Sequence, residues 1–222
     1  MIAFALLNLF HEPILSDTTH ENVASAMIAR LNVPNRLENL VDQYNLSQVR
    51  ASFIDLQYTP IDNVENNSLL QFPVLTMEDL FNISLGTYQI DNATSYYAQH
   101  QKEEVFLVKK FEGNSQSRIS SIDFSRHGIV ATDLVPVRAY MKSRFRGGKC
   151  HHIFVLADKA KAGRECIAEY FCTCESGSRT VGCCSHIMTV TWYLGYAQYN
   201  SISTPNPNIC DVSITIPRIT NT

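Results

Sequence analysis

Apolar residues in the first half of the chain recur at the three- and four-residue spacing that is typical of helices. The first ten residues predict a buried helix that ends before Pro13. Thr18 and Glu21 have the spacing of a capping box, which predicts the start of a second helix. Pro34 separates that helix from a third. The apolar residues of the third helix are Leu37, Leu40, Val41 and Tyr44. We therefore expect residues 1–56 to form a helical segment.

The helical pattern is interrupted and then resumes. Residues 57–73 carry scattered polar residues and prolines, and we expect a linker there. Thr76 can cap a short helix and Gly86 predicts a turn into a second one, so residues 74–104 are expected to form a helical pair. Residues 201–222 contain several prolines and predict a tail of loop or disorder.

From Val105 the pattern changes to that of strands, so we expect a strand-rich region over residues 105–200. The expected extended segments are Val105–Val108, Ser117–Phe124, Ile129–Ala131, Leu134–Met141, His152–Leu156 and Ile167–Phe171. Gly163 predicts the turn between the last two. The predicted fold class is α+β, with a helical N-terminal half and a strand-rich C-terminal half that ends in a ββα module.

Three cysteines and one histidine lie close together near the end of this region. They are Cys172, Cys174, Cys184 and His186. Three thiolates and one imidazole make a complete tetrahedral ligand set for Zn²⁺. Because four protein ligands leave no position for a catalytic water, the predicted cofactor is one structural zinc ion.

A helix is predicted directly after His186. Its apolar residues are Ile187, Val190, Tyr193 and Leu194, and Gly195 stands where a left-handed helix cap is expected. The first ligand pair follows the expected strand Ile167–Phe171. The metal ion would then join the end of a β-hairpin to the start of a helix.

The order of Cys-x-Cys and Cys-x-His between a hairpin and a helix resembles the SWIM-type zinc finger, over about residues 150–197. Residues 179–196 are similar to the version found in transposon-derived animal proteins. The resemblance implies a DNA-binding or protein-binding module. It also implies a ligand set, which is Cys172, Cys174, Cys184 and His186. Cys183 could close a site with His186 instead, and the family pattern selects Cys184.

A second similarity covers residues 2–17, which resemble the last helix and exit segment of DDE-type transposase domains. It implies that this chain lacks the acidic metal-binding triad of that family. The acidic residues between Asp17 and Asp79 are expected to cap helices or to face solvent. We therefore expect no nuclease activity and no catalytic residues.

The cysteines have other interpretations. A disulfide framework is one, but seven cysteines are an odd set. Thiol catalysis by Cys183 with His186 as its base is another, and no third group is evident to orient the pair. The remaining cysteines and nearby histidines are expected to be structural, surface or edge residues: Cys150, Cys166, Cys210, His151 and His152.

Charge is distributed unevenly, although the net charge is only -3. The N-terminal half is acidic, and basic residues gather between Asp133 and Asp158 with no acid among them. These are Arg138, Lys142, Arg144, Arg146 and Lys149. With Tyr140 and Phe145 between them, they predict a surface that contacts DNA through phosphates and stacked bases. A solvated strand face is the other interpretation.

The apolar start of the chain lacks the basic leading region and the cleavage pattern of a signal peptide. It is also too short to span a bilayer. We therefore expect a nuclear or cytoplasmic protein that has no membrane partner and no small-molecule substrate. If DNA is not the partner, a protein could dock on the aromatic residues Trp192, Tyr193 and Tyr196, although these equally suit the core face of a helix.

Overall fold

The computed structural model describes residues 21–48, 53–56, 71–102, 107–111, 122–144 and 148–200. The chain divides into two compact units, Met1–Pro34 and Asn35–Thr222. In the first unit, helix α2 (Glu21–Leu31) contains Glu21, the second residue of the predicted capping box, whereas Thr18 lies outside the described residues. The helix predicted for the first ten residues, the tail and Cys210 lie outside the described residues.

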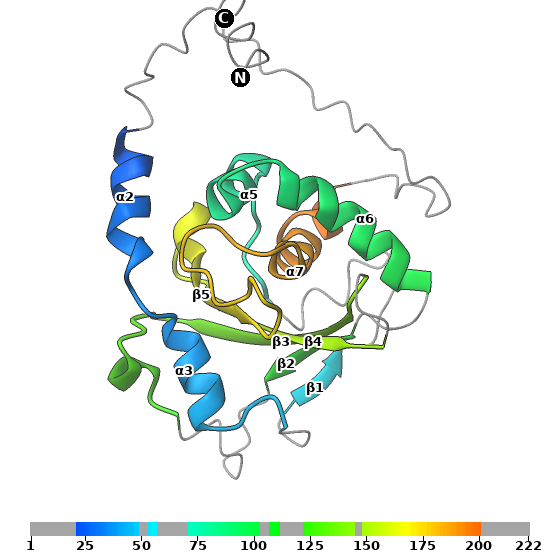
Figure 1. Cartoon of the computed structure of the whole chain (residues 1–222), viewed down its shortest axis with the longest axis horizontal. Coiled ribbons are helices and arrows are strands. Elements are labelled where there is room, and N and C mark those ends of the chain that lie inside the picture. The colour runs from blue at the N-terminus through cyan, green and yellow to red at the C-terminus, as the bar shows by residue number, and fades with distance from the viewer. Residues whose placement is uncertain are drawn as a thin grey trace, which may run out of the picture. The chain divides into compact units, whose positions relative to one another are not determined.

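The second unit is built on a five-stranded antiparallel sheet whose strands follow one another in chain order (Figure 1). The strands are β1 (Phe53–Leu56), β2 (Leu107–Phe111), β3 (Leu134–Lys142), β4 (Cys150–Asp158) and β5 (Ile167–Cys172). The register pairs Val137 with Val155 and Ile153 with Cys172. The predicted α+β class is confirmed.

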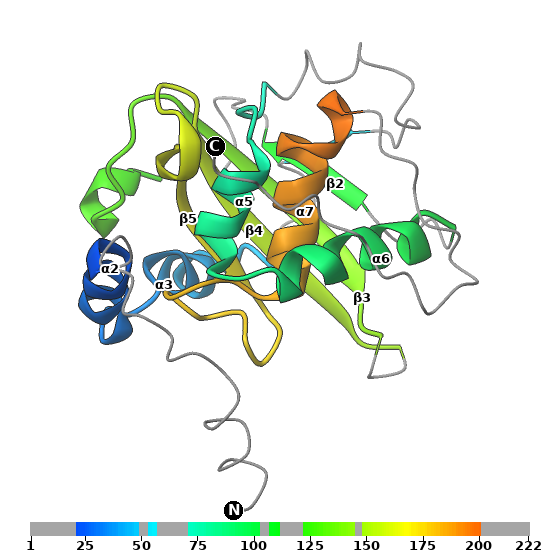
Figure 2. The same ribbon diagram turned by 90° about the horizontal axis from the view of Figure 1, so that it is seen from above.

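Helices cover both faces of this sheet (Figures 1 and 2). One face lies under α5 (Met77–Ser84), α6 (Tyr88–Lys102) and α7 (Ser185–Gly195), and the other lies against α3 (Arg36–Gln43). Strand residues alternate between the two cores because successive side chains point to opposite faces. Ile153 and Val155 belong to the core beneath α7, whereas Phe154 and Leu156 belong to the core beside α3.

The packing of α6 against α7 depends on aromatic rings. Tyr97 meets Trp192 edge to face at 5.6 Å and stacks on Tyr193 at 4.7 Å between ring centroids. Trp192 is 1% exposed and Tyr193 is 7% exposed, and Tyr196 packs against the same core. The protein-docking surface predicted around these residues is therefore wrong, because the rings fill the space between the helices.

The helical pair and the two zinc-proximal strands lie where the sequence predicts them. Thr76 and Asp79 form a reciprocal capping box at the start of α5. Two other secondary-structure predictions differ from the structure. Phe53–Leu56 is a strand rather than part of a helical segment, because it pairs with β2. Residues 129–131 form no strand, because Gly128 at φ 73° ends a short 3₁₀ helix directly before them.

Gly195 also differs from its predicted role as a left-handed cap. It is the last residue of α7, and its φ is not positive. A Cβ atom there would lie 2.6 Å from the Leu75 side chain, and the Gly195 carbonyl accepts a hydrogen bond of 2.8 Å from the Leu75 amide. Glycine is needed for this close approach rather than for a turn.

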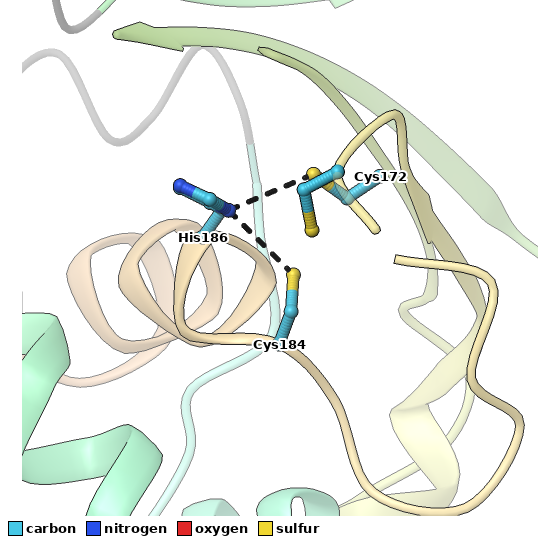
Figure 3. A group of neighbouring side chains, drawn as sticks. Cys172, Cys184 and His186 are labelled. Carbon is cyan, nitrogen blue, oxygen red and sulfur yellow. Dashed lines mark hydrogen bonds between the residues drawn. The ribbon is translucent and has the colours of Figure 1, made fainter. Parts of the chain in front are cut away.

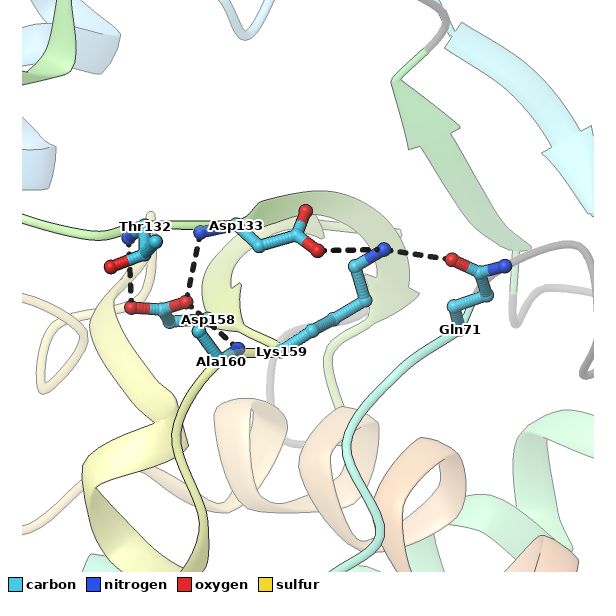
Figure 4. A network of polar contacts seen from close by, with 6 residues as sticks. All are labelled: Gln71, Thr132, Asp133, Asp158, Lys159 and Ala160. Atoms are coloured by element: carbon cyan, nitrogen blue, oxygen red, sulfur yellow. Dashed lines mark hydrogen bonds and ion pairs between the residues drawn. The ribbon is translucent and has the colours of Figure 1, made fainter.

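Asp158 fixes the end of the β3–β4 hairpin that lies away from the ligands (Figure 4). Its buried carboxylate accepts hydrogen bonds from the amides of Thr132, Asp133 and Ala160 at 3.0 to 3.1 Å. Lys159 adds an ion pair with Asp133 at 3.1 Å.

No helix in the described part of the chain is long and apolar enough to cross a bilayer.

Candidate metal centre

The first two candidate ligands lie where β5 ends. Cys172 is the last residue of the strand and is fully buried, and Cys174 follows in a turn and is partly exposed. Two hydrogen bonds close this turn: the Cys172 amide donates to the Gly177 carbonyl at 3.2 Å, and the Gly177 amide donates to the Cys174 carbonyl at 2.9 Å. The turn therefore brings both thiols to the same end of the sheet.

Gly177 makes this turn possible. A Cβ atom at Gly177 would lie 1.7 Å from the carbonyl oxygen of Cys172. The backbone crosses itself too closely there for any side chain, so only glycine fits. Further along the loop, the hydroxyl of Tyr170 donates a hydrogen bond of 2.8 Å to the Gly182 carbonyl. The loop between Cys174 and Cys184, called the ligand loop below, is thus attached to β5 at Gly177 and at Gly182.

The second pair of ligands lies at the start of α7. Cys184 is the N-cap residue and His186 is in the first turn, as the sequence predicts. The first turn of a helix presents unpaired amides and the positive end of the helix dipole, which stabilises a thiolate there. Contact with Cys172 and the Ile187 backbone in this turn lower the pKa of Cys184, although contact with Cys174 and burial outweigh them.

The four side chains converge on one point between β5 and α7. Their ligand atoms all lie within 4.8 Å of one another, so the group Cys172, Cys174, Cys184 and His186 could hold one metal ion. Nδ1 of His186 lies 3.9 Å from the sulfur of Cys172 and 3.9 Å from that of Cys184 (Figure 3). Nδ1 is therefore the ring nitrogen that faces the sulfurs and would bind a metal ion, and the other ring nitrogen points away from the sulfurs.

Cys183 does not belong to this group. Its side chain is buried in the core, and burial raises the pKa of its thiol well above the usual value. A buried neutral thiol is not a ready nucleophile, and Cys183 lies outside the group of ligand atoms. Of the two adjacent cysteines, the geometry selects Cys184. The six cysteines in the described part of the chain are all free thiols.

Without a cation, the three clustered thiols compete for negative charge. Hydrogen bonds from Cys172 and Cys184 lower the pKa of Cys174. Contacts with Cys174 and Cys184, together with burial, raise the pKa of Cys172. Contact with Cys172 lowers the pKa of Cys184, but contact with Cys174 and burial outweigh it and raise the value to about 12. A bound divalent cation would allow all three to ionise.

The imidazole of His186 lies between two other rings. Tyr96 of α6 meets it edge to face at 5.1 Å, and His151 of β4 lies 4.8 Å from it between ring centroids. Among the residues that the structure describes, neither Nε2 of His186 nor Nδ1 of His151 has a hydrogen-bond partner, although both atoms are buried. Burial lowers the pKa of His151, and the neighbouring His186 lowers it further.

His151 is thus not the satisfied surface or edge residue that the sequence predicts. It is only 5% exposed because the alternation of β4 turns it toward α7. Its neighbour His152 faces the other side and contacts Arg138 at 3.1 Å. The prediction of a satisfied histidine holds for His152.

A cavity of about 340 Å³ opens beside the ligands. Cys174, Cys184 and His186 line it, and the exposed cations Lys149 and Arg179 lie in its wall. The candidate metal centre is therefore covered by protein on the sides of β5 and α7. It is open toward the cavity, where Cys174 is its partly exposed residue.

Of the predicted basic residues that the structure describes, Arg138 and Arg144 make contacts within the fold. Arg138 is 8% exposed, and its guanidinium donates a hydrogen bond of 2.6 Å to the Ser47 carbonyl. Arg144 stacks on the Tyr96 ring at 4.0 Å and donates to Gln99 and Ser95 of α6. Arg138 is therefore held in contacts within the fold.

The other three predicted cations differ in their surroundings. Lys142, at the end of β3, is partly exposed and Lys149 is exposed, whereas Arg146 lies outside the described residues. Lys149 is the predicted basic residue best placed to meet a ligand, because it lies beside the cavity.

Two contacts that support the site carry no sequence signal. Asn35 caps α3 and also donates hydrogen bonds to the carbonyls of Tyr170 and Ser178, at 2.9 and 3.4 Å. The second contact is that of the Tyr96 and His186 rings. Both join residues far apart in the chain, so local patterns do not reveal them.

Comparison with protein-family models, curated proteins and solved structures finds no match to this chain.

Proposed function

We propose that the chain is a SWIM-type protein in which one zinc ion folds a ββα module, without catalytic activity, and that the module binds DNA or a protein partner. The observation that carries this proposal is the convergence of Cys172, Cys174, Cys184 and His186 within 4.8 Å. The order of the ligands supports the family, because two follow a hairpin strand and two begin a helix.

The donor set suits zinc. Three soft thiolates and one imidazole favour a tetrahedral site for Zn²⁺ over one for Mg²⁺ or Ca²⁺, which prefer oxygen. Ideal zinc distances place a ligating nitrogen roughly 3.6 Å from a ligating sulfur. The two nitrogen–sulfur distances of 3.9 Å are close to this value, so these two pairs need only a few tenths of an ångström of contraction.

A closed shell supports a structural role for the metal ion. Four protein ligands leave no position for an activated water, and no other residue is needed to hold the metal. Zinc sites of this kind contribute about 10 to 16 kcal/mol of apparent binding free energy in small peptides. In this chain the ion would fasten the end of β5 to the start of α7.

Metal analysis of the purified full chain under reducing conditions tests the proposal. We expect about one zinc per chain, in line with one four-ligand site, and thiolate charge-transfer bands when Co²⁺ replaces zinc. Cys172→Ser and Cys184→Ser should lose most of the metal, whereas Cys183→Ala should keep it. A wild-type protein that binds neither zinc nor cobalt would exclude the zinc function.

The proposed DNA contacts use the cations beside the cavity. Lys149 and Arg179 are exposed there, and the side chain of Tyr88 in the same wall is 70% exposed, which suits stacking on a base. Each phosphate contact steepens the dependence of affinity on salt by roughly 0.9 in a log–log plot. The double change Lys149→Glu with Arg179→Glu should flatten that slope in anisotropy titrations with duplex DNA.

A specific surface supports the alternative, a protein-interaction adaptor without nucleic-acid contact. Val74, Met77 and Phe81 are 61%, 42% and 44% exposed; Met77 and Phe81 lie one turn apart on α5, and Val74 lies in the segment directly before the helix. Large apolar side chains grouped at a surface mark interaction sites. Phe81→Asp should abolish partner binding in this case. The charge-reversal variant would then leave partner binding unchanged.

A further inference from the structure

His186 has one ring nitrogen that the ligand arrangement leaves unused. Nδ1 faces the sulfurs, so Nε2 lies on the far side of the ring (Figure 3). A neutral imidazole that binds a metal through Nδ1 carries its proton on Nε2. This N–H is buried, and it has no acceptor among the described residues. A buried donor without a partner is destabilising, so an acceptor is expected close by.

His151 has a ring nitrogen that could accept this hydrogen bond. Its Nδ1 is buried without a partner, and its ring lies 4.8 Å from that of His186 between centroids, at an interplanar angle of 43°. The side chain is held in place because β4 is an inner strand of the sheet, paired with β3 and β5. One ring thus has a spare donor, and the adjacent ring has a spare acceptor.

We propose that His151 is a positioning residue of the metal centre: its Nδ1 accepts the hydrogen bond of His186 Nε2–H when His186 Nδ1 binds the metal ion. Histidine ligands almost always donate their second nitrogen to a neighbour, which fixes the tautomer and the ring orientation. The inference rests on the proposed zinc function and adds a residue outside the four ligands.

The other neighbour of the His186 ring suits this role less well. Tyr96 meets His186 edge to face at 5.1 Å, and its ring face is occupied by the Arg144 guanidinium at 4.0 Å. Tyr96 therefore packs its ring against the imidazole, and it accepts no hydrogen bond from Nε2 of His186. His151 is the neighbour that has a lone pair and no partner for it.

Three variants of the full-length protein test the role of His151. His151→Leu removes the acceptor, and it should weaken zinc affinity by about 10- to 100-fold in competition with a chelator. His151→Asn places an amide oxygen near the former Nδ1 position and should restore most of the affinity. His152→Leu is the matched control on the opposite face of β4, and its zinc affinity should equal that of the wild type.

A spectroscopic measurement on the wild type does not depend on how the variants fold. In ¹⁵N-labelled zinc protein, the Nε2 proton of His186 should be protected from exchange and should show scalar coupling to Nδ1 of His151. Zinc bound without this coupling, or with equal affinity in His151→Leu, would overturn the inference and leave the zinc site intact. Failure of the wild type to bind zinc would overturn both.

Discussion

The side-chain amide of Asn35 donates a hydrogen bond of 2.9 Å to the carbonyl of Tyr170, which joins the start of α3 to strand β5. The side-chain oxygen of Asn35 simultaneously accepts the Glu38 amide at 2.9 Å and caps the helix. Ser178, in the ligand loop, donates a second bond of 2.6 Å to the Glu38 carboxylate. The start of α3 thus supports the loop that carries Cys174.

Replacing Asn35 by alanine should lower the free energy of unfolding by about 2 kcal/mol, because the helix loses its cap and a buried carbonyl loses its donor. Chemical denaturation followed by circular dichroism measures this change. The matched control is Asn39→Ala, an exposed position in the same helix, which should change stability by less than about 0.5 kcal/mol. Equal effects at the two positions would contradict the role of Asn35.

Gly177→Ala should distort the turn that follows Cys174, because the new methyl group would lie 1.7 Å from the Cys172 carbonyl oxygen. Overpacking of this kind costs about 1 to 3 kcal/mol, and here it moves a metal ligand. We expect weaker zinc binding and a lower unfolding temperature. Ser176→Ala, in the same turn, should leave both close to wild type, and wild-type metal affinity in Gly177→Ala would refute the clash.

Asp158 should make stability fall in acid. Burial raises the pKa of this carboxyl, but the amides of Thr132, Asp133 and Ala160 outweigh it and hold the pKa below its usual range. A folded-state pKa below the unfolded value stabilises the protein above about pH 4, and that stability is lost as the pH falls through the folded-state pKa. Asp158→Asn should therefore lower stability at pH 7 and reduce the loss between pH 4 and pH 2.

The exposed Asp133 provides the control for this pH experiment. Its carboxylate pairs with Lys159 at the surface, with 56% of the Asp133 side chain exposed. Asp133→Asn should leave the acid part of the stability curve nearly unchanged, because exposed ion pairs contribute little. An identical pH dependence in wild type and Asp158→Asn would show that other carboxyls cause the loss.

Local patterns predict much of this fold because the signals lie within a few residues of each other. The capping box of α5, the alternation of β4 and the start of α7 at Cys184 are such signals. The strand Phe53–Leu56 escaped prediction because its four residues gain strand character only from pairing with β2. The role of Gly195 was missed for a similar reason, since Leu75 lies far away in sequence.

The ligands could be predicted from the sequence, but not what surrounds them. Cysteine and histidine spacing encodes a metal site directly, so the four residues are found together. The position of His151 beside His186 depends on the β4 register and on the packing of α7 against the sheet. A basic run does not show which side chains face solvent, so the sequence did not reveal that Arg138 is buried.

Arg138 should prove to be a folding residue rather than a DNA contact. Its guanidinium donates to the Ser47 carbonyl at 2.6 Å and contacts Nδ1 of His152 at 3.1 Å. Arg138→Met should lower the free energy of unfolding by about 1 to 3 kcal/mol, because two partly buried acceptors lose their donor. It should leave the salt dependence of DNA affinity unchanged, unlike the double charge reversal at Lys149 and Arg179.

Titration of His152 by NMR gives an independent measure of the same contact. Burial is the main cause that lowers the pKa of His152, and the positive charge of Arg138 lowers it further. Removing that charge in Arg138→Met should raise the pKa of His152, although burial would still hold it below the usual value. If the pKa of His152 stayed unchanged while DNA affinity fell, Arg138 would face the nucleic acid rather than the core.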